Sequence, residues 1–203
     1  MPKKITLFFG SFNPVHNGHV AIAEYMVSHG LCDELWIIIS PQNPFKSNEE
    51  LAPERDRLAM ARIAIKESSF SEYIKVSDIE FSLSKPSYTV NTLRILRERY
   101  PDHEFSILMG EDNILLINKW KNYHEIINNC RIFVYKRRSY CFPQGTITEG
   151  DIVLLDDDAP YLDISSTEIR DFISQGKDIS GLVPQGVAKY IVTHRIYDSS
   201  DND

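Results

Sequence analysis

Short apolar runs alternate along this chain with longer segments in which apolar residues recur at helical spacing. The first run, Ile5 to Phe9, is rich in β-branched and aromatic residues and ends at Gly10, which is typical of a buried strand. After it, apolar residues recur every three or four positions from about Gly18 until Gly30, where a helix would end. The opening of the chain therefore predicts a strand, a glycine-rich loop and a helix.

The same alternation continues to the C-terminal part and predicts an α/β protein. We expect a doubly wound, mostly parallel, Rossmann-like sheet with helices on both faces and a small C-terminal helical portion. In such sheets ligands bind beyond the carboxyl ends of the strands, so the loop after the first strand is the expected site. Further strands are expected at residues 35–39, 105–109, 132–135 and 152–155, and helices around 58–65, 90–100, from 166 onward and around 187–192.

Length and composition limit the domain count and the class of partner. With 203 residues, we expect a single domain over residues 1–197 and a disordered acidic tail over 198–203. Hydrophobic residues make up 42%, but no apolar run is long enough to span a bilayer or to form a signal-peptide core, so no membrane partner is expected. A net charge of −7 argues against nucleic acid as a partner. The oligomeric state is left open.

Cysteine usage bears on the cellular compartment. Cys32, Cys130 and Cys141 are odd in number and widely spaced, so they offer neither a disulfide framework nor a CxxC metal pair. These features favour a cytoplasmic protein.

The loop between the first strand and the first helix, GSFNPVHNGH from Gly10 to His19, has residue types suited to phosphate. Gly10 and Gly18 allow close backbone approach, while His16 and His19 lie three apart at a helix start and can both donate to phosphate oxygens. The amides and dipole of a helix start favour an anion. Either histidine alone is more simply a helix cap or a core residue, but the pair with both glycines favours an anion site.

This loop resembles the HxGH signature of the nucleotidylyltransferase superfamily, and its full form is similar to nicotinate-nucleotide adenylyltransferases. The segment ISSTEIR, from Ile164 to Arg170, resembles a second motif, ISSTxIR, which implies another helix start and an arginine on the ATP phosphates. Without the resemblance, Ser165 or Ser166 would be read as a helix cap and Arg170 as a surface residue. The similarity extends from residue 5 to about residue 192.

Two segments between these motifs resemble the family's contacts to its second substrate. PQNPFK, from Pro41 to Lys46, resembles the loop that brings a lysine to the phosphates of both substrates; the alternative is a solvated lysine. PSYTVNTL, from Pro86 to Leu93, is similar to the stretch that contacts the pyridine nucleotide partly through backbone amides, here at Tyr88 and Thr89. A capped helix start would give the same residues.

Gly110 and Asp112, followed by Trp120, resemble the family's GxD and tryptophan, which implies that the aspartate contacts the adenosine ribose and the indole stacks on the pyridine ring. A tryptophan packed in the core is the alternative.

The sequence departs from the family at two places. Arg137 matches a family arginine, but Arg-Arg-Ser-Tyr replaces the usual Arg-Pro-Gly-Tyr, and Asn13 stands where many relatives have aspartate, so no acid or metal role is assigned to it.

The resemblance implies that the phosphate of nicotinate mononucleotide attacks the α-phosphorus of ATP, giving nicotinate adenine dinucleotide and pyrophosphate in NAD biosynthesis. It implies Mg²⁺ carried mainly by the ATP phosphates, with no metal cage in the protein. Pantetheine-phosphate adenylyltransferase, a cytidylyltransferase and a non-catalytic nucleotide-binding regulator are the alternatives. The expected catalytic residues are His16, His19, Lys46 and Arg170; the expected ATP-binding residues are Gly10, Ser11, Phe12, His16, Gly18, His19, Gly110, Asp112, Ile164, Ser165, Ser166, Thr167 and Arg170; the expected mononucleotide-binding residues are Lys46, Tyr88, Thr89, Trp120 and Arg137.

Overall fold

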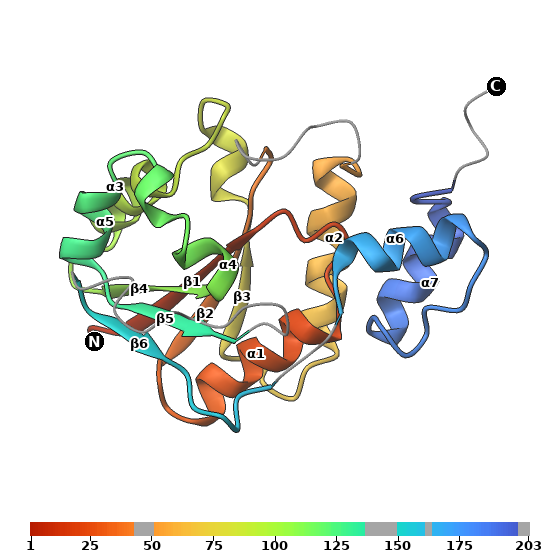
Figure 1. Cartoon of the computed structure of the whole chain (residues 1–203), viewed down its shortest axis with the longest axis horizontal. Helices are drawn as coiled ribbons and strands as arrows, with labels where there is room; N and C mark the ends of the chain where they lie inside the picture. Colours follow the sequence, from red (N-terminus) through yellow and green to blue (C-terminus); the bar gives the residue numbers. More distant parts are fainter. Residues whose placement is uncertain (43–50, 137–149, 161–163, 199–203) are drawn as a thin grey trace.

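Within residues 1–42, 51–136, 150–160 and 164–198, which the computed structural model describes, six strands form one parallel sheet (Figure 1). The strand order is β3-β2-β1-β4-β5-β6, and every pairing is parallel. The fold class predicted from the sequence is therefore confirmed. The strands are β1 (Lys4–Gly10), β2 (Glu34–Ile39), β3 (Ile74–Ser77), β4 (Glu104–Gly110), β5 (Ile132–Tyr135) and β6 (Ile152–Leu154).

Helices join the strands and cover both faces of the sheet. The first of them, α1, stops just before Gly30, which adopts a φ of +65°, a value that glycine tolerates best. The helices are α1 (Asn17–Ser28), α2 (Glu54–Lys66), α3 (Thr89–Arg99), α4 (Glu111–Ile114), α5 (Tyr123–Asn129), α6 (Ser166–Ser174) and α7 (Gln185–His194), with 3₁₀ turns η2 (Ile79–Ser82) and η3 (Ile117–Lys119).

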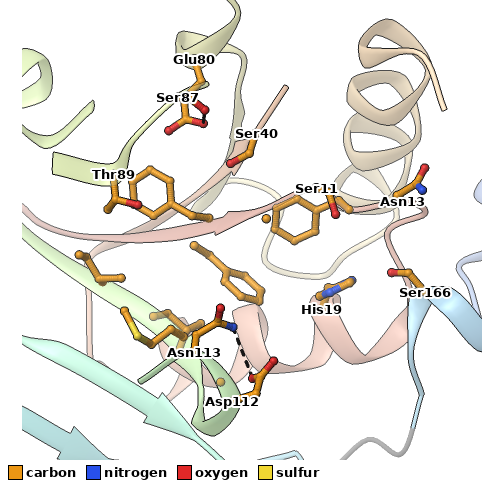
Figure 2. A pocket seen from close by; sticks show the side chains of 18 of the residues that line it. Ser11, Asn13, His19, Ser40, Glu80, Ser87, Thr89, Asp112, Asn113 and Ser166 are labelled. Carbon is orange, nitrogen blue, oxygen red and sulfur yellow. Dashed lines mark hydrogen bonds between the residues drawn. The ribbon is translucent and has the colours of Figure 1, made fainter. Parts of the chain in front are cut away.

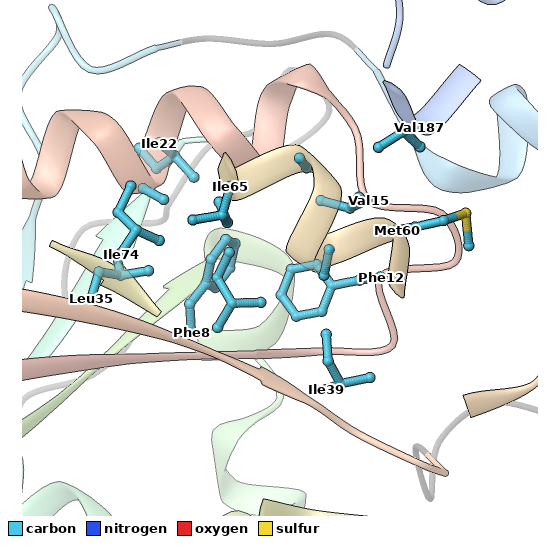
Figure 3. Close-up of a cluster of buried hydrophobic side chains, with 14 of the residues drawn as sticks. Phe8, Phe12, Val15, Ile22, Leu35, Ile39, Met60, Ile65, Ile74 and Val187 are labelled. Carbon is cyan, nitrogen blue, oxygen red and sulfur yellow. The ribbon is translucent and has the colours of Figure 1, made fainter. Parts of the chain in front are cut away.

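Each face of the sheet has its own hydrophobic core, because successive strand residues point to opposite sides. Phe8 packs in a cluster with Ile22 of α1 and residues of α2 and α7 (Figure 3). The preceding residue, Leu7, belongs to a second cluster with Leu93 of α3 and Ile126 of α5. Since both faces are covered, the inner strands of the sheet are largely apolar runs rather than alternating ones.

The C-terminal helices are joined to the first of these two cores. Helix α7 packs on α2, with Val187 and Ile191 buried in the cluster that contains Phe8. Two polar contacts support this packing: the Tyr190 hydroxyl donates to Asp56 at 2.9 Å, and the backbone N–H of Gly186 donates to Glu67 at 2.8 Å. Residues 199–203 of the expected tail lie outside the described residues, so the domain boundaries stay a prediction.

Strand β3 and helix α5 are the main elements that the sequence analysis did not predict. Strand β3 has four residues, of which Lys75 and Ser77 are polar, and it pairs with β2 alone at the edge of the sheet. A short, half-polar edge strand gives little periodic signal. No helix in the described part of the chain is both long enough and apolar enough to cross a membrane.

Candidate active site

A cavity of about 810 Å³ lies beyond the carboxyl ends of β1 and β4 (Figure 2). Its lining includes Gly10 at the end of β1, Gly110 at the end of β4 and Ser40 after β2. The strand order reverses between β1 and β4, so the cavity occupies the position where we expected a ligand. Figure 2 shows His19 and Ser166 toward one end of this cavity and Ser87 and Thr89 toward the other.

The two histidines of the first loop meet at the start of α1. His16 is buried and directly precedes the helix, and its ring stacks on that of His19, with ring centroids 3.5 Å apart. The backbone N–H of His16 donates to Nδ1 of His19 at 3.2 Å. Because Nδ1 accepts this bond, a neutral His19 carries its proton on Nε2, which makes that nitrogen a donor. Both rings line the cavity.

Phe12 lies in the same loop with its side chain in the core and its backbone at a φ of 46°. Its ring contacts Phe8 and His19 edge to face, with centroids 5.3 Å and 4.9 Å apart. A phenylalanine in the left-handed region is rare and needs surrounding contacts to hold it there. These ring contacts fix the loop and also support the imidazole of His19.

The second motif forms the start of α6, as expected. Ser165 caps this helix: its hydroxyl accepts from the backbone N–H of Glu168 at 3.2 Å, and the Glu168 carboxylate accepts from the backbone N–H of Ser165 at 2.9 Å. The cap that sequence reasoning kept as the plain alternative is therefore present. It leaves the helix start well ordered beside the cavity, which Ser165, Ser166 and Thr167 line.

Two contacts bring this helix start to the first loop across a long stretch of sequence. The Ser166 hydroxyl donates to the backbone oxygen of Pro14 at 2.9 Å, although the two residues are 152 positions apart. Nη1 of Arg170 donates to the backbone oxygen of Asn13 at 3.0 Å. Two helix N-termini and an arginine consequently face one end of the cavity, an arrangement that favours a polyphosphate.

Arg57 of α2 holds the loops after β1 and β2, and sequence reasoning missed it. Its side chain is only 1% exposed. It donates to four backbone oxygens: those of Ser11 at 2.6 Å, Ser40 at 2.8 Å, Ala52 at 3.0 Å and Pro41 at 3.1 Å. Burial lowers the pKa of Arg57 from its usual value. In the sequence it is one charged residue in an amphipathic helix, so no local signal marks it.

The opposite end of the cavity is formed by the start of α3 and the turn after η3. Tyr88 directly precedes α3 and Thr89 is its first residue, and both line the cavity with Trp120. Trp120 is partly buried against the second core cluster, so it is both a packing residue and a wall of the cavity. Lys121, another lining residue, places its Nζ 4.4 Å from the centre of the Tyr88 ring.

Glu80 anchors the segment that leads into α3. Its carboxylate is 1% exposed and accepts from the hydroxyls of Ser87 and Thr92, each at 2.7 Å. Because Ser87 precedes Tyr88 and Thr92 follows Thr89, these two hydrogen bonds fix the position of the segment between them. Glu80 and Ser87 also line the cavity, and only the tertiary structure reveals the hydrogen bond between them. Across the cavity, Asp112 accepts from Asn113 at 3.4 Å.

Most described residues of the predicted site come together at this cavity. Gly18 and Ile164 are described but are not part of its lining. Lys46 and Arg137 lie outside the described residues. In the described ranges no group of three His, Cys, Asp or Glu side chains is placed to hold a metal ion. The predicted residues that line the cavity are Gly10, Ser11, Phe12, His16, His19, Tyr88, Thr89, Gly110, Asp112, Trp120, Ser165, Ser166, Thr167 and Arg170.

This sheet order, with two helix starts at its switch point, defines a nucleotide-binding α/β protein. A family model described as Cytidylyltransferase-like matches residues 7–172. A Flavobacterium johnsoniae protein named "Probable nicotinate-nucleotide adenylyltransferase" is 43% identical over 194 residues, which cover 96% of this chain and 98% of that protein. A Bacteroides fragilis protein of the same name is 36% identical, with 93% and 91% covered. The chain belongs to the nicotinate-nucleotide adenylyltransferase family.

Solved structures resemble the fold over nearly the whole chain. A Plasmodium falciparum nicotinic acid mononucleotide adenylyltransferase complexed with NaAD superposes with a TM-score of 0.82 and 23% identity, covering 96% of this chain and 97% of that one. The same enzyme complexed with APC gives a TM-score of 0.80 and 22% identity, with the same shares of the two chains covered. At these identities the likeness concerns the fold.

Proposed function

We propose that this protein transfers AMP from ATP to nicotinate mononucleotide, releasing pyrophosphate and forming nicotinate adenine dinucleotide for NAD biosynthesis. One observation carries the proposal: a single cavity is bounded at one end by the starts of α1 and α6 and at the other by Tyr88, Thr89 and Trp120. The first end suits a triphosphate, and the second suits a flat pyridinium ring that can stack on an indole. The names of its relatives agree with this activity.

The chemistry asks the protein to align two anions rather than to activate a nucleophile. The phosphate of the mononucleotide is already ionised near neutral pH, so no general base is needed. On this proposal, Nε2–H of His19 and the guanidinium of Arg170 donate to oxygens of the α-phosphate and the leaving pyrophosphate, where charge builds up. The helix starts hold the triphosphate in line for attack. Lys46 is assigned the same role from sequence alone.

We further propose that Mg²⁺ arrives with ATP. The described part of the cavity wall presents donors at the helix starts rather than a cluster of carboxylates, which suits an ion held by phosphate oxygens and water. Bound there, Mg²⁺ would reduce the negative charge of the triphosphate. The chain's own residues then bind the phosphate oxygens that the ion leaves available.

The partners proposed are small molecules, ATP and nicotinate mononucleotide, in the cytoplasm. The net charge of −7 argues against a nucleic-acid partner. A pantetheine-phosphate adenylyltransferase would share the histidine loop but would not need the Tyr88 segment and Trp120 in the cavity wall. Those two features favour the pyridine nucleotide.

Parallel reactions with three acceptors test the proposal. The protein is incubated with Mg²⁺ and ATP, together with nicotinate mononucleotide, nicotinamide mononucleotide or phosphopantetheine, and pyrophosphate release is followed. The fastest release is expected with nicotinate mononucleotide. Preference for phosphopantetheine would identify the rival transferase. CTP is tested as a second nucleotide donor. Tight ATP binding, without pyrophosphate release from either donor with any acceptor, would identify a nucleotide-binding regulator.

A further inference from the structure

Asn13 is a buried junction between the first loop and three other segments. It is 2% exposed, and its side-chain oxygen accepts from the backbone N–H of Ala52 at 3.0 Å and from the hydroxyl of Tyr197 at 2.7 Å. Its backbone oxygen accepts from Arg170 at 3.0 Å. One residue of the loop is thus tied to the segment before α2, to α6 and to the segment after α7.

The fold holds Tyr197 in the backbone conformation that allows its contact with Asn13. Its backbone φ is 68°, a value that non-glycine residues rarely adopt and that surrounding contacts must maintain. Burial raises the pKa of Tyr197, and the nearby positive charges of Arg170 and Arg57 only partly oppose that rise. The phenol therefore keeps its proton at neutral pH, and it acts as the donor in its bond to Asn13.

The orientation of the Asn13 side-chain amide must be fixed for the first loop to keep its conformation. The side-chain oxygen sits between two donors, so the group cannot rotate without leaving both of them unpaired in the interior. Its backbone oxygen then lies where Arg170 reaches it, which holds the guanidinium beside the cavity. Removing the Tyr197 hydroxyl loosens this arrangement from outside the cavity, because Tyr197 is not among its lining residues.

We propose that Tyr197 is a positioning residue for ATP: through Asn13 it fixes the first loop and Arg170 in the geometry that binds the triphosphate. This inference rests on the proposed function in one respect: the ATP phosphates are taken to bind at the first loop. Tyr197 does not line the cavity, so its contribution is to reduce the ordering that ATP must impose when it binds. Its loss should affect ATP much more than the mononucleotide.

The test is Tyr197→Phe with Tyr190→Phe as the matched control. Both substitutions remove one phenolic O–H from the same C-terminal region, but the Tyr190 hydroxyl donates to Asp56 rather than to the first loop. ATP affinity is measured by calorimetry, and the Michaelis constants for ATP and nicotinate mononucleotide are measured by initial rates. Tyr197→Phe should weaken ATP binding about 3-fold to 10-fold, the loss expected for one net hydrogen bond. Its constant for the mononucleotide should stay within about twofold.

A double-substitution cycle separates positioning from general destabilisation. In an Asn13→Ala background the Tyr197 hydroxyl has lost its acceptor, so adding Tyr197→Phe should change ATP affinity by less than about twofold. Asn13→Asp keeps acceptor oxygens for both donors and should retain ATP binding. If Asn13→Ala does not fold, the pair of tyrosine variants still decides the matter.

Each outcome has one meaning. Equal ATP affinity in Tyr197→Phe and Tyr190→Phe would overturn the inference and leave the proposed activity standing. If the wild-type protein forms no dinucleotide, and ATP affinity falls in Tyr197→Phe but not in Tyr190→Phe, the proposed activity is overturned and the inference is supported. A wild-type protein that does not bind ATP would overturn both.

Discussion

The imidazole rings of His16 and His19 stack at the start of α1, and Nδ1 of His19 accepts a hydrogen bond from the backbone N–H of His16. The stack and this bond fix the orientation of His19 and place its proton on Nε2 when the ring is neutral. Edge contacts with the rings of Phe8 and Phe12 hold the imidazole from the other side. The second histidine of the HxGH pattern is consequently a preorganised donor rather than a flexible side chain.

His19→Ala should lower turnover by about 100-fold or more while leaving the fold intact, because on the proposed mechanism it removes a donor to charge that grows in the transition state. Turnover is measured with saturating ATP and nicotinate mononucleotide, and folding by circular dichroism. His29→Ala, at the exposed end of the same helix, is the control and should keep normal turnover. Near-normal turnover in a folded His19→Ala protein would remove His19 from the mechanism.

Arg170→Lys should reduce the catalytic efficiency for ATP by about 10-fold or more, with a smaller effect on the mononucleotide. Lysine keeps the charge but lacks the fork that can reach the Asn13 carbonyl and phosphate oxygens together. Steady-state kinetics with each substrate varied in turn give the two efficiencies. Arg62→Lys, on the exposed face of α2, is the control. ATP kinetics equal to those of the control would place Arg170 outside the phosphate contacts.

Trp120→Ala should raise the Michaelis constant for nicotinate mononucleotide much more than that for ATP. The expectation follows if the indole stacks on the pyridinium, a contact of about 0.5 to 2 kcal/mol. Trp36→Phe is the control, since Trp36 packs near Tyr100 and Phe105 and is not in the cavity wall. Equal increases for both substrates, or a loss of thermal stability alone, would mean that Trp120 serves only as a packing residue.

The enzyme should prefer nicotinate over nicotinamide mononucleotide by about 10-fold to 100-fold in catalytic efficiency. A carboxylate accepts at both oxygens, whereas an amide must turn its NH₂ toward a donor and leave buried groups unpaired. The proposed donors are the backbone N–H groups of Tyr88 and Thr89, which line the cavity at the start of α3, a helix with no acidic residue in its first turn. The ratio of efficiencies under identical Mg²⁺ and ATP tests this preference.

Two side-chain variants and one control variant refine the specificity test. Thr89→Ala should erode the acid preference only partly, since the proposed donors are backbone groups. Lys121→Gln removes a cation beside Tyr88 and should reduce the preference about 2-fold to 5-fold. Lys177→Gln removes a similar cation from above Phe172 and should leave the preference unchanged. A wild-type ratio near one would show that the pocket does not distinguish the carboxylate.

Glu34 should make the stability of the fold sensitive to acid. Burial alone would raise the pKa of Glu34, but hydrogen bonds from Lys3, Lys75 and Trp36 outweigh that effect and lower it to about 2. The folded pKa lies below the unfolded value, so this stabilisation is complete above about pH 4.5 and is lost as the pH falls toward 2.

Glu34→Gln should therefore unfold more easily than wild type at pH 7, by about 1 to 3 kcal/mol, and the difference should shrink by pH 3. Urea unfolding at both pH values measures it. Glu125→Gln, which disrupts an exposed pair with Arg94, is the control and should show a smaller pH-dependent difference. A difference for Glu34→Gln that is the same at both pH values would contradict the assignment.

Most of the order of elements, and the place of the site, could be predicted from the sequence. Runs such as Ile5 to Phe9 are apolar throughout because both faces of the sheet are covered, and that pattern is local. The two loop motifs could likewise be identified as helix starts because capping and glycine requirements act over a few residues. The elements missed, β3 and α5, are short and carry weak periodicity.

Only the tertiary structure decided how these parts meet. Ser166 reaches Pro14, Tyr197 reaches Asn13, and Arg57 gathers loops from two strands, all across separations that no local pattern records. Such contacts depend on how whole helices pack against the sheet, so the same side chains would be solvated if the packing differed. The sequence by itself indicated a phosphate-binding loop, because that chemistry depends on residue types and short motifs, and its resemblance to the family implied a pyridine-binding segment. Their convergence on one cavity is a property of the folded chain, because long-range packing sets the distances between them.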